Sequence, residues 1–180
     1  TRAHWAEGLD IKIGEPAEYL FYVGCAGSFD DRNKKVSIAT AKLLKEAGVD
    51  FTILGEMEAC NGDPARRAGN EFLFQMMAEM NVDTMNSLGT LKVITACPHC
   101  FHTIGKEYEK FGGKYEVYHH SQILNELRQK EKIIIKDFED KVTFHDPCYL
   151  CRIGAVPYNP LTVPTNNAEE NAGVRGPTKH

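Results

Sequence analysis

Short apolar runs alternate with amphipathic stretches along most of the chain. The apolar runs have the length and composition of buried β-strands, and they occupy residues 20–23, 51–54, 92–96, 115–118 and 141–144. Between them, apolar side chains recur at helical spacing. This alternation over short connections predicts an α/β domain, with a parallel sheet of about five strands and helices on both faces.

Turn and capping residues mark where several of these helices begin and end. Asp30-Asp31 offer an N-cap to a helix that ends at Gly48. Asp63-Pro64 predict the start of the next helix, with Asp63 as its N-cap and the helical residues running from Ala65 to about Met80. That helix is apolar on most sides and is expected to be well buried, because it carries Phe72, Leu73, Phe74, Met76 and Met77. Ser121 is expected to cap a shorter helix.

Composition divides the chain into three parts. Residues 1–18 are mixed and polar apart from Trp5, and we expect them to be a lead-in to the patterned domain at 19–153. The pattern stops at about residue 154. Frequent proline, asparagine, threonine and glycine then predict an extended or disordered tail over 154–180.

Charge and hydropathy exclude some classes of function. The formal net charge is -4 and Lys and Arg form no dense run, which argues against a nucleic-acid binder. No apolar run approaches the length of a membrane span, and the first residues lack the pattern of a signal peptide. We therefore expect a cytoplasmic protein that reaches the inner face of a membrane only through partners.

The cysteines carry the most unusual chemistry of the chain. Cys25 and Cys97 each follow a predicted strand, and Cys60 lies in the loop after another. Because the carboxyl ends of parallel strands meet at one edge of an open sheet, where ligands bind, we expect these thiols to lie together. Without an export signal, one close pair and two distant single cysteines favour reduced ligand thiols over disulfides.

The close pair is Cys97-Pro98-His99-Cys100, which can place two sulfurs on one metal centre. Alone, such a pair serves zinc, iron–sulfur or dithiol redox chemistry. Together with Cys25 and Cys60 it predicts a site with four thiolate ligands, which suits either zinc or an iron–sulfur cluster. Helices that begin near these loops favour the anionic cluster electrostatically.

Histidines share the expected edge of the sheet. His119 and His120 follow the fourth predicted strand, and His145 follows the fifth, close to Cys148. Polar groups near a cluster shift its potential and can relay protons. These four residues are the candidates for lining the site or facing a substrate, and the sequence assigns no catalytic residue among them.

Four motifs stand in a fixed order along the chain. They are Gly24-Cys25, residues 60–71 with their start Cys60-Asn61-Gly62-Asp63-Pro64, Cys97-Pro98-His99-Cys100-Phe101, and Phe144-His145-Asp146-Pro147-Cys148-Tyr149-Leu150. Together they resemble the cysteine-rich CCG domains of iron–sulfur oxidoreductases, over about residues 4–152. The similarity extends to the B and D proteins of heterodisulfide reductase, and especially to iron–sulfur oxidoreductases linked to electron-transfer flavoproteins and the heterodisulfide-reductase-like component of benzoyl-CoA reductase complexes.

The chain departs from that family pattern at two places. Members often have two adjacent cysteines in the middle motif, and the second is Asn61 here, so the resemblance implies a [4Fe–4S] cubane instead of a five-cysteine non-cubane cluster. Cys148 matches the first cysteine of a second motif set that the chain does not complete, so one cluster is expected. Cys148 is then an exchangeable fifth ligand, half of a second site, or a buried thiol. Cys151 stands where relatives commonly have glycine.

The resemblance implies a [4Fe–4S] cluster on Cys25, Cys60, Cys97 and Cys100, within an electron-transfer module of a larger oxidoreductase. The expected partners are an electron-transfer flavoprotein, ferredoxin-type or flavin subunits, and the expected acceptor is a quinone or a thiol/disulfide. Two alternatives stay open: a structural zinc domain that mediates contacts between subunits, and a thiol–disulfide oxidoreductase that uses Cys97 and Cys100.

Overall fold

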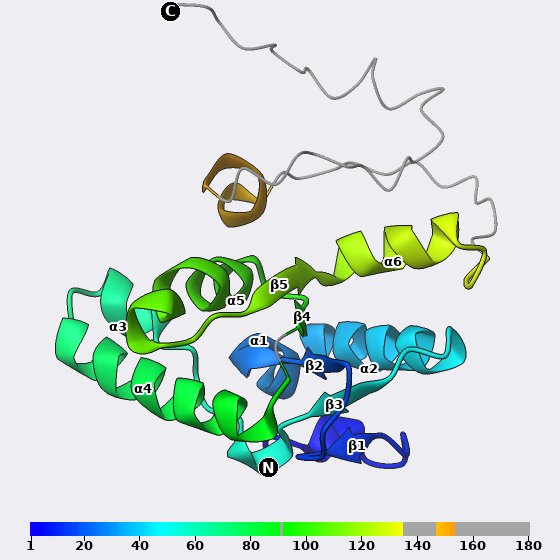
Figure 1. Cartoon of the computed structure of the whole chain (residues 1–180), viewed down its shortest axis with the longest axis horizontal. Helices are drawn as coiled ribbons and strands as arrows, with labels where there is room; N and C mark the ends of the chain where they lie inside the picture. Colours follow the sequence, from blue (N-terminus) through cyan, green and yellow to red (C-terminus); the bar gives the residue numbers. More distant parts are fainter. Residues whose placement is uncertain (91, 135–146, 154–180) are drawn as a thin grey trace, which may run out of the picture.

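A parallel five-stranded sheet forms the centre of the protein. The computed structural model describes residues 1–90, 92–134 and 147–153. Across the sheet the strand order is β1-β3-β2-β4-β5 (Figure 1). The strands are β1 Lys12–Ile13, β2 Tyr19–Phe21, β3 Phe51–Ile53, β4 Lys92–Thr95 and β5 Glu116–His119. Every neighbouring pair is parallel, which confirms the predicted α/β fold.

The edge strand β1 lies within residues 1–18, which were expected to be a lead-in. It pairs with β3 over only two residues, and its Ile13 side chain is exposed. A strand this short has no alternating apolar pattern, so the sequence carries no signal for it. The same segment also adds to the core, because the ring of Trp5 packs edge-on against Phe21 with centroids 6.1 Å apart.

Helices cover both faces of the sheet. The α-helices are α1 Gly24–Phe29, α2 Asp31–Glu46, α3 Asp63–Arg67, α4 Glu71–Leu88, α5 Pro98–His102 and α6 His120–Gln129. Short 3₁₀ or π turns are η1 His4–Ala6, η2 Gly55–Met57, η3 Thr103–Glu107, η4 Tyr108–Phe111 and η5 Cys148–Ile153. One core cluster joins Leu20 to Phe74 of α4, and a second joins Phe21 to Leu44 of α2. Successive strand residues thus point to opposite faces.

Helix α2 begins and ends where the sequence predicts. The Asp30 side chain accepts a hydrogen bond from the Asn33 backbone N–H at 2.8 Å, which is an N-cap. Gly48, just beyond the helix, has φ of +72°, a conformation that glycine adopts without steric cost. The local capping signals were therefore sufficient to place this helix.

The single helix predicted from Ala65 to about Met80 is two helices. The chain turns at Gly69, where φ is +83°, and Asn70 caps the start of α4 by accepting the Leu73 backbone N–H at 3.1 Å. At the start of α3, the N-cap is Gly62 and Asp63 is already helical, so the prediction of Asp63 as N-cap is wrong by one residue.

The expectation that this helix is well buried is wrong for its outer side. Phe74 is fully buried, but Phe72 is 74% exposed and Met76 is 52% exposed. The apolar content of α4 exceeds what one core-facing stripe requires. Apolar side chains therefore continue around to the side that faces away from the sheet.

The junction of β5 and α6 also differs from expectation. The N-cap residue is His119, whose backbone N–H donates to Gln122 Oε1 at 2.8 Å, and Ser121 is already inside the helix. The fifth strand predicted at 141–144 and the tail predicted at 154–180 lie outside the residues that the structure describes.

Candidate functional site

Three neighbouring strands carry the cysteines to one edge of the sheet. Cys25 lies in α1 directly after β2, Cys60 lies in the loop after β3, and Cys97 follows β4. β2 lies between β3 and β4, so the next strand of the chain, β3, is added on one side of β2 and the strand after it, β4, is added on the other side. The carboxyl edge at such a topological switch point is where open α/β sheets bind ligands.

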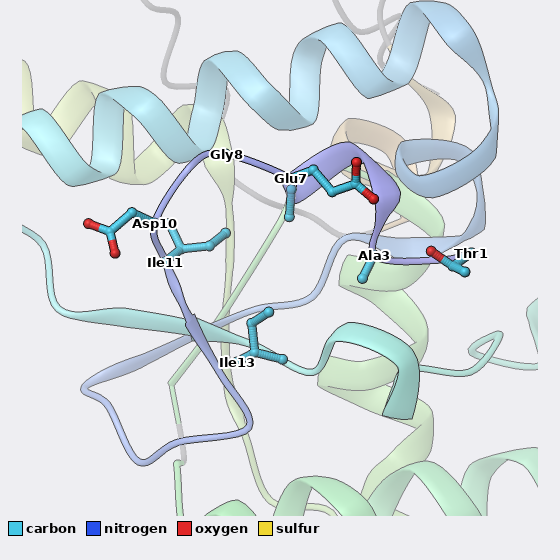
Figure 2. A pocket seen from close by; sticks show the side chains of 8 residues that line it. Thr1, Ala3, Glu7, Gly8, Asp10, Ile11 and Ile13 are labelled. Atoms are coloured by element: carbon cyan, nitrogen blue, oxygen red, sulfur yellow. The ribbon is translucent and has the colours of Figure 1, made fainter.

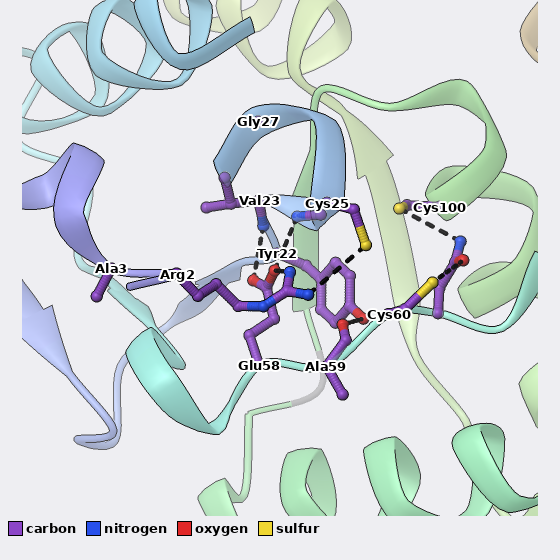
Figure 3. Close-up of polar contacts among 12 residues, drawn as sticks. Arg2, Ala3, Tyr22, Val23, Cys25, Gly27, Glu58, Ala59, Cys60 and Cys100 are labelled. Carbon is purple, nitrogen blue, oxygen red and sulfur yellow. Dashed lines mark hydrogen bonds and ion pairs between the residues drawn. The ribbon is translucent and has the colours of Figure 1, made fainter. Parts of the chain in front are cut away.

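The thiols at this edge face one another. The sulfur atoms of Cys25, Cys60 and Cys100 point into one small space (Figure 3). The Cys60 side chain lies close enough to Cys25 to shift its pKa, and the Cys100 side chain has the same effect on Cys97. Cys100 is buried and the other three are partly buried. The structure thus brings the four predicted ligands together as two thiol pairs.

Within each pair, one thiol loses its proton more readily than the other. The neighbouring Cys60 thiol lowers the pKa of Cys25 to about 5, and Arg2 adds to this effect. The Cys25 thiol and burial raise the pKa of Cys60. In the second pair, the Cys100 thiol lowers the pKa of Cys97 to about 6, while the pKa of Cys100 rises. The thiolate is the form of cysteine that binds metals.

Backbone N–H groups also face the sulfur atoms. The Gly62 N–H lowers the pKa of Cys60, and the N–H groups of Cys100 and His99 lower the pKa of Cys97. Donors of this kind stabilise negative charge on sulfur without adding a charged residue. The loops that carry the cysteines are therefore suited to an anionic ligand.

Two glycines of the cysteine motifs have positive φ angles and close neighbours, so a side chain has no room at either position. Gly24 has φ of +78°, and a Cβ at this position would lie 3.1 Å from Cys100 Sγ. Gly62 has φ of +84°, and its Cβ would lie 2.9 Å from the ring of Phe74. Any other residue would be strained at both positions. The motif glycines are therefore required by geometry.

A partly buried ion pair lies beside Cys25, with Glu58 buried and Arg2 partly exposed. The Glu58 carboxylate accepts hydrogen bonds from the backbone N–H groups of Val23 and Gly24, each at 2.9 Å. Arg2 places one guanidinium nitrogen 3.2 Å from Glu58 Oε1 and another 3.6 Å from Cys25 Sγ (Figure 3). Burial raises the pKa of Glu58 to about 7. Sequence analysis missed both residues, because neither belongs to a local pattern.

Asn61 occupies the corresponding place beside Cys100. Its side-chain amide donates to Cys100 Sγ at 3.3 Å and accepts the Asp63 backbone N–H at 3.0 Å. The Tyr108 hydroxyl donates to the Asn61 carbonyl at 3.0 Å. Where family members often have a second cysteine, this chain has a buried hydrogen-bond donor to a thiol.

The predicted histidines have different environments. The His119 ring is buried and lies 3.2 Å from the Ala96 carbonyl and 2.7 Å from the Ser121 hydroxyl. Burial and the nearby His120 lower the pKa of His119 to about 3, so its ring is neutral. Burial also lowers the pKa of His120. His145 lies outside the described residues, and a substrate-facing role for these histidines stays a prediction.

Cys148 lies on η5, close to the second thiol pair. The Tyr149 ring stacks on His99 with centroids 4.0 Å apart, and His99 Nδ1 is 2.8 Å from the Asp63 carboxylate. This contact places η5 beside α5, which carries Cys100. Cys148 is exposed, so the alternative that it is a buried thiol is wrong. Its other two roles stay predictions.

Two surface hollows lie away from the thiols. One, of about 320 Å³, is lined by Thr1, Ala3, Ala6, Glu7, Gly8, Asp10, Ile11 and Ile13 (Figure 2). The other, of about 230 Å³, is lined by Phe101, His102, Gly105, Lys106, Tyr115 and Val117. Neither of these two hollows includes a cysteine, so neither is part of the thiol site.

The facing thiols do not form a site for a single metal ion. Within 1–90, 92–134 and 147–153, no three His, Cys, Asp or Glu side chains are grouped to hold one metal ion. A cluster makes a different demand, since each cysteine binds a separate iron atom. In the same ranges, no helix has both the length and the apolar character needed to cross a membrane.

Comparison with known proteins assigns the part of the chain that carries the thiols. Residues 19–105 match the family model of the CCG cysteine-rich domain. This segment is a CCG domain. Its boundaries enclose Cys25, Cys60, Cys97 and Cys100, and the match confirms the resemblance that the sequence motifs indicated.

Several much longer proteins are similar to this chain. It is 45% identical over 151 residues to "EtfAB:quinone oxidoreductase" of Syntrophomonas wolfei, a match that covers 83% of the chain and 21% of that protein. "Probable iron-sulfur-binding oxidoreductase FadF" of Bacillus subtilis is 45% identical over 150 residues, with the same coverages of 83% and 21%. The D component of the dihydromethanophenazine:CoB–CoM heterodisulfide reductase of Methanosarcina acetivorans is 33% identical over 150 residues, covering 79% of the chain and 36% of that protein. The chain thus spans about a fifth of the first two relatives. No solved structure matches it.

Proposed function

We propose that this chain is an iron–sulfur electron-transfer module of a larger oxidoreductase, with one [4Fe–4S] cluster on Cys25, Cys60, Cys97 and Cys100. The observation that carries the proposal is the meeting of these thiols at the switch point of a CCG domain. The names of the relatives support it, since they include an iron–sulfur-binding oxidoreductase and a quinone oxidoreductase.

The residues at the site fit such a group chemically. Thiolates are the usual ligands of iron–sulfur clusters, and the buried carboxylate of Glu58 is already occupied by backbone N–H groups and Arg2. Gly24 leaves the space beside Cys100 Sγ free of a side chain. The N–H groups that face Cys60 and Cys97 stabilise the negative charge that these cysteine sulfurs carry as ligands.

When bound, the cluster would supply a one-electron carrier. The residues of this chain bind it, bury it and set the energy of its charge states. Arg2 donates toward Cys25 Sγ and Asn61 donates to Cys100 Sγ. Hydrogen bonds to ligand sulfurs stabilise the more negative, reduced state, so both residues would raise the reduction potential.

The relatives' names also suggest which electron donors and acceptors this module would have. Electrons would enter from an electron-transfer flavoprotein, a ferredoxin-type protein or a flavin subunit. They would leave to a quinone or to a thiol/disulfide acceptor. The module would work in the cytoplasm, with any membrane contact made by a partner, and the exposed thiol of Cys148 is the residue best placed to face an acceptor.

Anaerobic isolation tests the proposal directly. Iron, acid-labile sulfide and zinc are measured on one sample, and the visible spectrum is recorded before and after dithionite. The expected result is about four iron and four sulfide per chain and a colour that bleaches on reduction. About one zinc without sulfide, in protein kept strictly anaerobic, would overturn it in favour of the structural zinc domain.

Single Cys→Ser variants test the ligand set. Iron content is expected to fall to background in the variants of Cys25, Cys60, Cys97 and Cys100, because each removes one cluster ligand. Cys148→Ser is the matched control, since its thiol is exposed on a separate turn, and it is expected to keep its iron. Full iron in any of the four would remove that residue from the set.

A second candidate function rests on one pair. The neighbouring Cys100 thiol lowers the pKa of Cys97 to about 6, and a low-pKa thiol in a C-x-x-C pair is typical of dithiol redox proteins. A thiol–disulfide oxidoreductase would keep its reductase activity in Cys25→Ser and Cys60→Ser. The cluster proposal expects both variants to lose iron and electron transfer together.

A further inference from the structure

The outer side of α4 carries a line of exposed apolar residues. Phe72, Met76 and Met80 recur at every fourth position and therefore lie along one side of the helix, with Leu73 next to them. All four are exposed. We call these four residues the α4 ridge. In Figure 1, α4 runs along the outer margin of the molecule.

The same side of α4 is acidic. The helix contains Glu71, Glu79 and Asp83 and has no Lys, Arg or His. Glu71 is neutralised by Arg66 of α3, whose Nε lies 3.3 Å from its carboxylate. Glu79 and Asp83 are exposed beside the ridge, and within the described residues neither enters an ion pair. The ridge therefore lies next to negative charge that is free to receive a cation.

The inner side of α4 supports the Cys60 loop. Phe74 and Met77 lie against Gly62, and the Asn81 side chain donates to the Cys60 carbonyl at 2.8 Å. One helix thus has the thiol site on one side and the ridge on the other. A molecule on the ridge would be separated from the Cys60 loop by about the diameter of a helix, 10–12 Å.

We propose that the α4 ridge docks a partner protein through an amphipathic helix whose apolar stripe is flanked by Lys and Arg. An apolar line on a helix surface is the complement of a partner's apolar stripe. Methionines adapt to varied partner surfaces, and exposed aromatic residues such as Phe72 often dominate binding energy. Basic flanks complete the fit because they meet Glu79 and Asp83.

The same charges argue against other occupants of the ridge. A second copy of the ridge would not complement Glu79 and Asp83, because α4 has no Lys, Arg or His to meet them. Anionic membranes attract basic surfaces and would repel these acids. The proposal does not depend on which group the thiols bind, so its failure and that of the cluster proposal are distinguishable.

Binding of two designed peptides to the full chain tests the proposal. The probe is a helical peptide of about 20 residues, long enough to hold a helix, with leucines along one stripe and lysines on its flanks. The second peptide has glutamate in place of every lysine. Fluorescence anisotropy is expected to show binding of the lysine peptide, weakened by added salt, and at least about tenfold weaker binding of the glutamate peptide.

Met76→Ser is expected to weaken binding of the lysine peptide about tenfold, because it removes the centre of the apolar contact. Met57→Ser is the matched control, since Met57 is equally exposed but lies in η2, and it is expected to bind like the parent. Glu79→Lys with Asp83→Lys is expected to shift the preference to the glutamate peptide.

Three outcomes would overturn the proposal. The first is equal binding of both peptides. The second is binding of the lysine peptide that Met76→Ser leaves unchanged, which places the contact elsewhere. The third is self-association of the chain that Met76→Ser abolishes in sedimentation experiments, which makes a second copy the occupant.

Discussion

The two thiol pairs are supported in different ways. Cys25 and Cys60 come from the ends of separate strands, and the charged group beside them is Arg2, far away in the sequence. Cys97 and Cys100 lie within one short turn, and their neighbour is the uncharged, buried amide of Asn61. The first pair depends on long-range folding and an ion pair, whereas the second depends on local geometry and a neutral hydrogen bond.

Because of this difference, the two thiol pairs should respond to different substitutions. A change that disturbs tertiary contacts should reach Cys25 and Cys60 first, since Val23, Gly24 and Arg2 all meet at one carboxylate. The second pair should respond to changes within its own turn and at Asn61, which reaches Cys100 Sγ from the Cys60 loop. Substitutions at Glu58, Gly24, Asn61 and Arg2 should therefore have distinct effects on the two pairs.

Replacement of the buried carboxylate should have the largest effect. Glu58→Ala leaves Arg2 and two buried backbone N–H groups without their acceptor. Unpaired buried donors cost about 1–3 kcal/mol each, so we expect a loss of about 3 kcal/mol. Urea unfolding measures the loss, and iron content should fall with it. Glu46→Ala, which removes an exposed carboxylate from α2, is the control and should change stability little. Equal stability of the two variants would contradict this account of the first pair.

A methyl group at Gly24 should come next. Gly24→Ala adds both the strain of a positive φ and the contact with Cys100 Sγ, and we expect a loss of about 2 kcal/mol and less bound iron. Gly48→Ala separates these causes, because its φ of +72° is similar but its Cβ would meet open space. That control should lose about 1 kcal/mol and keep its iron. Loss of iron in both variants would assign the effect to strain alone.

Asn61→Asp should change the second pair without altering its shape. Aspartate keeps the acceptor for the Asp63 N–H but removes the donor to Cys100 Sγ and adds negative charge. The reduction potential of the proposed cluster is expected to fall by about 60 mV, which is about 1.4 kcal/mol for a one-electron couple. Redox titration measures it. Asn125→Asp, a buried amide of α6, is the control, and a similar fall there would make the effect one of net charge.

Arg2→Gln should give the smallest change, on the first pair. It removes a positive charge near Cys25 Sγ, so the potential should fall by about 20 mV at low salt, the scale of a partly exposed ion pair. Added salt should reduce this difference but leave that of Asn61→Asp unchanged, because Asn61 is buried. Arg32→Gln, at an exposed arginine of α2, should have no effect. If salt changed the effects of Arg2→Gln and Asn61→Asp equally, the proposed difference between a charged and a neutral neighbour would be wrong.

The parts of the site that the sequence predicts are those with local signals. Apolar runs before Cys25, Cys60 and Cys97 place three strands, and their common parallel direction places the thiols at one edge. The C-x-x-C turn is visible in four residues. Arg2 and Glu58 had no such signal, because they are 56 residues apart and only the finished fold brings them together.

The helix α4 illustrates a different limit. Its apolar residues were counted without regard to which side each one faces. Phe74, Ala78 and Met85 point into the core, while Phe72 and Met76 lie on the opposite side. Apolar content alone cannot separate a buried helix from one with two apolar sides. The sequence did not predict the turn at Gly69, because the apolar residues that follow it continue the helical pattern of α3 into α4.

The strand order β3-β2-β4 also affects how the protein is made. On the ribosome, β2 and Cys25 emerge before either of the strands that flank them. Both edges of β2 therefore cannot be paired until β4 and Cys100 have been synthesised, and unpaired strand edges promote aggregation. During that interval Cys25 is a free thiol with an ordinary pKa, and it becomes the more reactive thiolate only when Cys60 and Arg2 fold against it.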